Sequence, residues 1–279
     1  MAGKSPLEYI ESLPREIIYT ILIICLAIPL VKPLFLPVPV SPRVVEWHEY
    51  IENLPDGAYV LFSVDYGVGS LPALEPFAVA TLHDLFSKNV KVVLMTLYSD
   101  GPICYRSLIA QVNPDAYGKK YGEDYVFLGY IPGTETAMKA IAENLPGAVP
   151  TDYKGTPITD IPMMKGITGA RNFAMIISIT PSGDVSQGWV RQWVGPYGVT
   201  YLCCVLAMMM PTMEPYYPAQ VKALTDGGRA GEYEFIIGKP GSGLRKLDAF
   251  TVAHIMLMAA IIMGNIAYFA LKAQKKGGA

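Results

Sequence analysis

The chain is short of charge, and this shortage excludes some classes of protein. Charged residues make up 16% of the 279 residues, the formal net charge is −2, and no long run of lysine or arginine occurs. No nucleic-acid partner is therefore expected, because such partners select clustered positive charge. The mean hydropathy of +0.31 is high for a soluble domain of this size, so part of the chain is expected in lipid.

Cysteine and histidine are also scarce. The chain has four cysteines, with no CxxC spacing and with Cys25 inside an apolar stretch, so neither a disulfide framework nor a zinc motif is expected. Cys203 and Cys204 stand in the run VTYLCCVLAMMM, where they are expected as small buried hydrophobic residues. Of the three histidines, His83 has no partners at metal-ligand spacing. We therefore expect no metal and no cofactor.

Two apolar segments, residues 17–38 and 249–271, each have about the 20 residues that cross a hydrocarbon core of roughly 30 Å. We interpret both as transmembrane helices and the lipid bilayer as a partner. The other boundaries follow from composition: a tail with an interfacial helix (1–16), a proline-rich stalk and amphipathic lead-in helix (39–54), a central domain (55–237), a basic joint (238–248) and a basic tail (272–279).

The central domain predicts an α/β fold. Between Tyr59 and Ile131 the pattern is strand, helix, strand, helix, strand, and the strands are apolar without alternation. Such strands are covered by helices on both faces, which indicates a parallel sheet with right-handed crossovers. Further strands are expected at 173–180 and 199–207, and a helix at the end of 219–237. The predicted class is an open, mostly parallel sheet of the flavodoxin or Rossmann type, flanked by helices and tethered by the two membrane helices.

Small polar residues follow the first three predicted strands. They are Asp65 and Ser70 after the first strand, Asp100 after the second, and Thr134 and Thr136 after the third. Ligands of open α/β sheets bind at this carboxyl edge, where free N–H groups of helix N-termini attract anions. These residues are therefore candidates to bind a small anionic ligand. Alternatively, they act only as helix caps, which Ser, Thr and Asp commonly do.

Motifs of catalysis and of nucleotide binding are incomplete. The segment GVGSLP has Pro72 where a dinucleotide fingerprint needs its third glycine, and GKPGSGLRK lacks the Lys-Ser/Thr pair of a phosphate loop. Neither GxSxG nor HExxH occurs. An acid/base enzyme that uses Asp65 and Asp100 is therefore the third of three functional hypotheses.

The last apolar segment carries features beyond hydrophobicity. Ala260 and Gly264 form a small-xxx-small pair that lets two helices approach closely, while His254 and Asn265 are polar groups that need partners in lipid. These four residues predict helix–helix packing within the membrane. A homo-oligomer or the subunits of a membrane complex are the partners that this pattern favours.

Two spans place both termini on one side of the cell membrane. Arg15 directly precedes the first apolar run, which favours cytoplasmic termini and an extracytoplasmic domain. The unpaired cysteines favour the opposite orientation, because free thiols are commoner in reducing compartments.

The first functional hypothesis is thus a membrane-anchored, non-enzymatic α/β protein that acts as a structural or assembly subunit of an oligomeric complex. The alternative is a membrane-bound sensor or binding module with a small anionic ligand at the strand ends. By fold-level analogy, an α/β domain between two membrane anchors resembles auxiliary subunits of some membrane machines.

Overall fold

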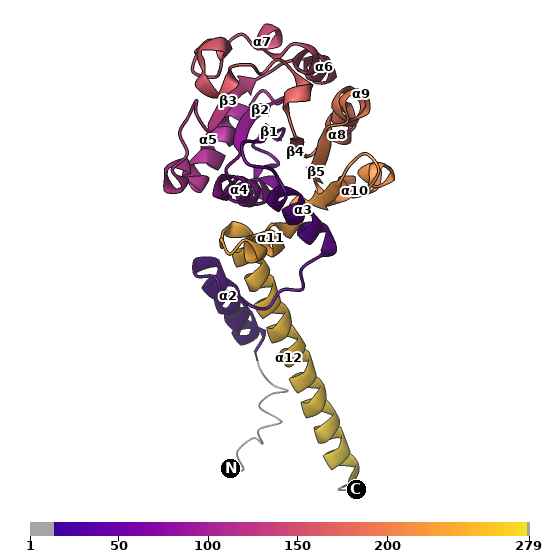
Figure 1. The fold of residues 1–279 in the computed structure, drawn as a ribbon. Coiled ribbons are helices and arrows are strands. Elements are labelled where there is room, and N and C mark those ends of the chain that lie inside the picture. Colours follow the sequence, from indigo (N-terminus) through magenta and orange to yellow (C-terminus); the bar gives the residue numbers. More distant parts are fainter. Residues whose placement is uncertain (1–13, 278–279) are drawn as a thin grey trace. The chain divides into compact units, whose positions relative to one another are not determined.

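The computed structural model describes residues 14–277, drawn in Figure 1, and these fall into two compact units. The first unit is Val38–Gly243, which contains every strand of the described chain. The second combines the described parts of Met1–Pro37 and Leu244–Ala279, and therefore joins segments from both ends of the sequence. The interfacial helix expected within residues 1–16 falls almost wholly outside the described residues.

The first unit is built on a six-stranded sheet in which all neighbouring strands are parallel. The strand order is β3-β2-β1-β4-β5-β6, so the chain moves outward from β1 and then returns to the other side of it. This doubly wound order has its switch point between β1 and β4, and it confirms the predicted parallel α/β class. The strands are β1 (Tyr59–Val64), β2 (Lys91–Thr96), β3 (Tyr125–Tyr130), β4 (Met175–Thr180), β5 (Thr200–Val205) and β6 (Ala223–Asp226).

Successive residues of a strand enter opposite cores, and both cores are apolar. In β1, Val60 and Phe62 belong to the core on one face of the sheet, whereas Leu61 belongs to the core on the other. Side chains alternate across a strand, so a strand covered on both faces needs apolar residues at nearly every position. This requirement explains why the β1 and β2 sequences show no polar alternation.

Helices cover both faces of the sheet (Figure 1). One face packs against α3 (Pro42–Glu52), α4 (Leu71–Ser87), α5 (Gly101–Val112) and α11 (Ala230–Ile236). The other packs against α6 (Glu135–Glu143), α8 (Gly183–Trp189) and a π-helical turn, η5 (Val190–Val194). The shorter helices are α7 (Leu145–Ala148), α9 (Gly195–Tyr197) and α10 (Met210–Met213), and the 3₁₀ turns are η1 (Pro114–Tyr117), η2 (Ile158–Asp160), η3 (Pro162–Met164), η4 (Ala170–Asn172), η6 (Ala207–Met209), η7 (Glu214–Tyr216) and η8 (Gly227–Arg229).

The long connection between α7 and β4 is ordered by apolar side chains of its own. Ile158, Ile161 and Met164 are buried in the core that also contains α6 and α8. Burial of this kind stabilises an irregular segment without a regular ladder of backbone hydrogen bonds. The connection therefore packs on its own domain.

Two segments differ from the sequence-based expectation. Residues 219–237 do end in the expected helix, α11, but they also contain β6, which pairs with β5 from Leu202 opposite Ala223 to Val205 opposite Asp226. A strand of four residues is too short to show a pattern, so its identity comes from the neighbouring strand.

The basic joint predicted at 238–248 is the second difference, because α12 (Ser242–Gly277) begins inside it. The Glu234 carboxylate accepts hydrogen bonds from the N–H groups of Gly241 (2.8 Å) and Gly243 (3.0 Å), which fixes the start of this helix. A Cβ on Gly243 would lie 2.7 Å from the Gly231 nitrogen, so the close approach requires glycine.

The second unit contains a helix suited to a membrane. Within the described residues, α12 is the one helix long and apolar enough to cross a bilayer, over the 33 residues Ser242–Gln274. The other helix of this unit, α2 (Arg15–Val31), has 17 residues and ends before the predicted limit at residue 38. At 1.5 Å per residue it is about 26 Å long, slightly less than a typical hydrocarbon core.

A buried carboxylate holds the chain that follows α2. Asp248 of α12 is fully buried and accepts hydrogen bonds from three consecutive N–H groups, those of Leu34 (2.7 Å), Phe35 (3.1 Å) and Leu36 (3.2 Å). Phe35 has a φ of 53°, an uncommon conformation for a non-glycine residue, and it lies in the middle of this series. Successive N–H groups of this kind form a concave anion site, which the protein fills with its own side chain.

Candidate functional site

The carboxyl ends of the strands meet where the sequence predicts a ligand site, but Asp65 does not face a ligand. It is fully buried at the end of β1, where its carboxylate accepts hydrogen bonds from the Leu97 N–H (2.8 Å) and the Trp189 Nε1–H (3.4 Å). Burial raises the pKa of the Asp65 carboxyl to about 6. Asp65 thus connects β1 to the segment after β2 and to α8.

Asp100 fixes the loop between β1 and α4. The Asp100 carboxylate accepts a hydrogen bond from the Val68 N–H at 2.9 Å, and a Cβ on Gly67 would overlap this carboxylate. Ser70 stands at the start of α4, but its hydroxyl makes no capping hydrogen bond. Of these two predicted residues, Asp100 therefore shapes the loop that follows the first strand.

A cavity of about 480 Å³ lies at the carboxyl ends of β2, β3 and β4. Of the five predicted ligand residues, Thr134 lines the cavity, whereas Asp65, Ser70, Asp100 and Thr136 do not. The lining residues are Leu97, Tyr98, Ser99, Tyr130, Thr134, Glu135, Met138, Ser182, Asp184, Val185 and Arg191.

Thr134 has an unusual backbone. Its φ is 43° and its ψ is −110°, a conformation that costs free energy for a β-branched residue. Such outliers cluster at binding and catalytic sites, where the surrounding structure over-determines them. The unusual backbone therefore supports a functional role for this cavity.

An ion pair crosses the cavity wall. Arg191 donates two hydrogen bonds to the Glu135 carboxylate, at 2.9 and 2.7 Å, and the Gln192 amide donates a third at 2.8 Å. Hydrogen bonding from Arg191 lowers the pKa of the Glu135 carboxyl to about 2. Arg191 and Gln192 belong to the π-helical turn η5, and π-turns frequently occur at functional sites.

Tyr98 connects the cavity with the two predicted aspartates. Burial raises the pKa of its hydroxyl, and the charges of Asp65 and Asp100 add to this shift although a hydrogen bond to Thr180 opposes it. Neither aspartate lines the cavity, but the charges of both act on the hydroxyl of Tyr98, which does. Sequence reasoning located the edge of the sheet but missed Glu135, Asp184 and Arg191, because their convergence depends on how α6, α8 and η5 pack.

The buried thiols are not activated nucleophiles. Burial raises the pKa of the Cys104 thiol to about 11, and it also raises the pKa of Cys203. A neutral buried thiol is chemically inert. Their burial agrees with the predicted packing role of Cys203 and Cys204.

The four predicted helix-packing residues lie on α12, where the surface of the second unit is largely uncovered. His254 is exposed, and its ring hydrogen-bonds the Phe250 carbonyl of the same helix at 2.6 Å. A Cβ on Gly264 would meet nothing within 4 Å, and Asn265 beside it is exposed. Ala260 is partly exposed on the same helix.

Comparison of the chain with family models, with curated proteins and with solved structures gave no match. The fold itself therefore defines the class: a doubly wound, parallel α/β domain in a chain that also carries a helix able to cross a membrane.

Proposed function

We propose that this protein is a membrane-anchored, non-enzymatic α/β subunit that assembles into an oligomeric membrane complex through α12. The observation that carries this proposal is the open face at Gly264 and Asn265. In lipid, an exposed carboxamide gains free energy by hydrogen bonding to a neighbouring helix, and a glycine beside it permits the close approach.

The spacing on α12 supports the same proposal. Ala260 and Gly264 are four residues apart, which places them on one face of a helix. This face carries small side chains while its surroundings carry large exposed ones, such as Ile261, Ile262 and Met263. A second copy of α12, or a helix of another subunit, would fit against the small-residue face.

The experiment is a measurement of the oligomeric state in detergent. We expect Gly264→Leu to weaken self-association about tenfold, because close packing and an interhelical hydrogen bond together contribute about 1–2 kcal/mol. Ala259→Leu is the matched control, since it adds similar volume to exposed Ala259 on another face of α12. A wild-type protein that is monomeric at micromolar concentration would contradict the proposal.

The proposed topology has two membrane passes, with α2 as the first span, both termini in the cytoplasm and the α/β unit outside. The apolar sequence of α2 and the position of Arg15 at its first residue support this arrangement.

A second candidate function is ligand binding at the cavity beside Thr134. Its support is the combination of the 480 Å³ volume, the Thr134 backbone and the Arg191–Glu135 ion pair. Arg191 is the only cationic group among the lining residues. An anionic ligand, which the sequence predicts, would therefore have to replace the Glu135 carboxylate as the partner of Arg191.

This second function is tested by a ligand-induced rise in Tm across small anionic and cationic polar compounds. Arg191→Gln and Thr134→Gly should remove the rise for a compound that binds in the cavity. Lys139→Gln is the control, because Lys139 lies exposed on α6 with a long 3.9 Å ion pair to Glu143 and does not line the cavity. If no compound raises Tm, or if a compound raises Tm equally in the wild type and all variants, the result counts against this function.

A further inference from the structure

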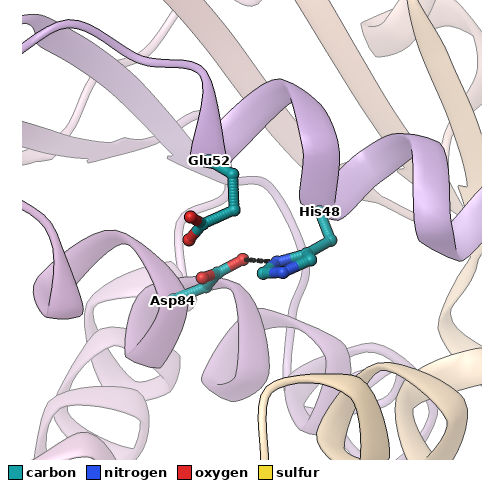
Figure 2. Close-up of side chains that lie close together, drawn as sticks. All are labelled: His48, Glu52 and Asp84. Atoms are coloured by element: carbon teal, nitrogen blue, oxygen red, sulfur yellow. Dashed lines mark hydrogen bonds and ion pairs between the residues drawn. The ribbon is translucent and has the colours of Figure 1, made fainter.

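A second cluster of polar side chains lies on the opposite face of the sheet from the cavity. His48 and Glu52 are four residues apart on α3, and Asp84 approaches them from α4, as Figure 2 shows. Each residue offers one ligand atom, and these atoms lie within 4.8 Å of one another. The sequence did not reveal the cluster, because Asp84 comes from a separate helix.

We propose that His48, Glu52 and Asp84 form a binding site for a divalent transition-metal cation of the zinc type. One imidazole and two carboxylates are a donor set that zinc accepts, and three protein ligands leave a fourth position for water. The two ligands of α3 stand on one face of that helix, since residues four apart are neighbours. The cation would thus join α3 to α4.

The burial of Asp84 is the observation that points most directly to a cation. Its side chain is 3% exposed, on a helix that packs against the apolar core of the sheet. The Tyr233 hydroxyl donates a hydrogen bond to it at 2.6 Å, and a second polar group of this kind commonly orients a metal-binding carboxylate. A buried carboxylate prefers a paired or metal-coordinated state over isolation.

The present arrangement needs only small changes to accept the cation. His48 Nδ1 lies 2.8 Å from Asp84 Oδ2, whereas two ligands on a tetrahedral zinc are separated by about 3.4 Å. Glu52 can supply the remaining adjustment, because its side chain is 46% exposed and forms an ion pair with Lys88 at 3.1 Å that does not involve His48 or Asp84. The cation would take the place of the hydrogen bond between His48 and Asp84.

The alternative is a purely structural chain of hydrogen bonds from Tyr233 through Asp84 to His48. The two cases differ in whether the protein takes up a cation stoichiometrically. The full chain is purified in detergent without a polyhistidine tag, treated with EDTA, and titrated with Zn²⁺ by calorimetry. We expect one equivalent of Zn²⁺ to bind, and Co²⁺ at the same site to give the visible absorption of a low-coordinate complex.

Three variants locate the site. His48→Gln and Glu52→Gln should each weaken Zn²⁺ binding by about 100-fold or more, which exceeds the usual effect of losing an outer partner. His83→Gln is the matched control, because His83 is also partly buried on α4 but hydrogen-bonds Tyr117 at 2.7 Å. Binding that is absent, or that is unchanged by Glu52→Gln, overturns the proposal. Glu52 takes no part in the hydrogen bond between His48 and Asp84. Glu52→Gln therefore tests the metal site even if His48→Gln fails to fold.

Discussion

At the scale of single residues, the polar groups at the carboxyl edge of the sheet have two different roles. Asp65 and Asp100 hold loops in place, whereas Thr134, Glu135 and Arg191 surround a cavity. A sequence cannot separate these roles, because both require polar residues just after a strand. The structure separates them by their partners: the Asp65 carboxylate is buried and the Asp100 carboxylate is partly exposed, but each accepts a hydrogen bond from a backbone N–H group of a loop.

The pKa of Asp65 predicts how stability depends on pH. The folded state binds this proton more tightly than the unfolded state, with a pKa of about 6 against an ordinary value of 3.8. The free energy of unfolding therefore includes the whole contribution of this group below about pH 4, and this contribution is lost as the pH rises to about 6. The loss is at most about 3 kcal/mol, and above about pH 6 the free energy of unfolding no longer changes through this group.

The measurement compares the free energy of unfolding of the wild type with that of Asp65→Asn between pH 4 and pH 7. The wild type should lose stability relative to the variant as the pH rises, because an asparagine does not titrate. Parallel pH profiles for the two proteins would show that Asp65 titrates normally in the folded state.

At the scale of elements, long apolar runs made five strands predictable. The first three strands lie between Tyr59 and Ile131 as expected, and β4 and β5 begin and end within two residues of the limits 173–180 and 199–207, because a strand covered on both faces is apolar throughout. The sixth strand escaped prediction, since its four residues include Thr225 and Asp226 and it depends on pairing with β5. Short edge elements owe their structure to neighbours more than to their own sequence.

Asp248 gives a prediction at this scale. Replacing Asp248 with asparagine removes the carboxylate that accepts hydrogen bonds from three backbone N–H groups. A hydrogen bond to a charged group stabilises the folded state by at most about 1.5–3 kcal/mol. We expect hydrogen exchange at Leu34, Phe35 and Leu36 to accelerate at least about tenfold. Amides of β1 serve as the internal reference, and unchanged exchange at Leu34–Leu36 would mean that the carboxylate contributes little to their order.

At the scale of the whole molecule, the proposed two-pass topology can be tested by labelling. Thr159→Cys places a thiol on the exposed surface of the α/β unit, and Ala273→Cys places one near the end of α12. The native Cys104, Cys203 and Cys204 are buried and should stay silent. A membrane-impermeant maleimide should label Thr159→Cys in intact cells and Ala273→Cys only after permeabilisation. The reverse pattern would place the α/β unit in the cytoplasm.

The boundary between the two units was partly predictable. The apolar segment 249–271 lies within α12, but the helix extends to Ser242 because Glu234 fixes its first turn. The end of α2 at Val31 was not predicted, since the apolar sequence continues past it while the prolines that follow keep the chain extended.

The bonds of Asp248 join residues separated by 214, 213 and 212 positions in the chain. A ribosome therefore completes the entire α/β unit before the partner of Leu34–Leu36 has been synthesised. Until residue 248 has been synthesised, the N–H groups of Leu34–Leu36 lack this acceptor. We therefore expect the second unit to close only after the chain of the α/β unit is complete, and a chain truncated before residue 248 to leave these three N–H groups without their carboxylate.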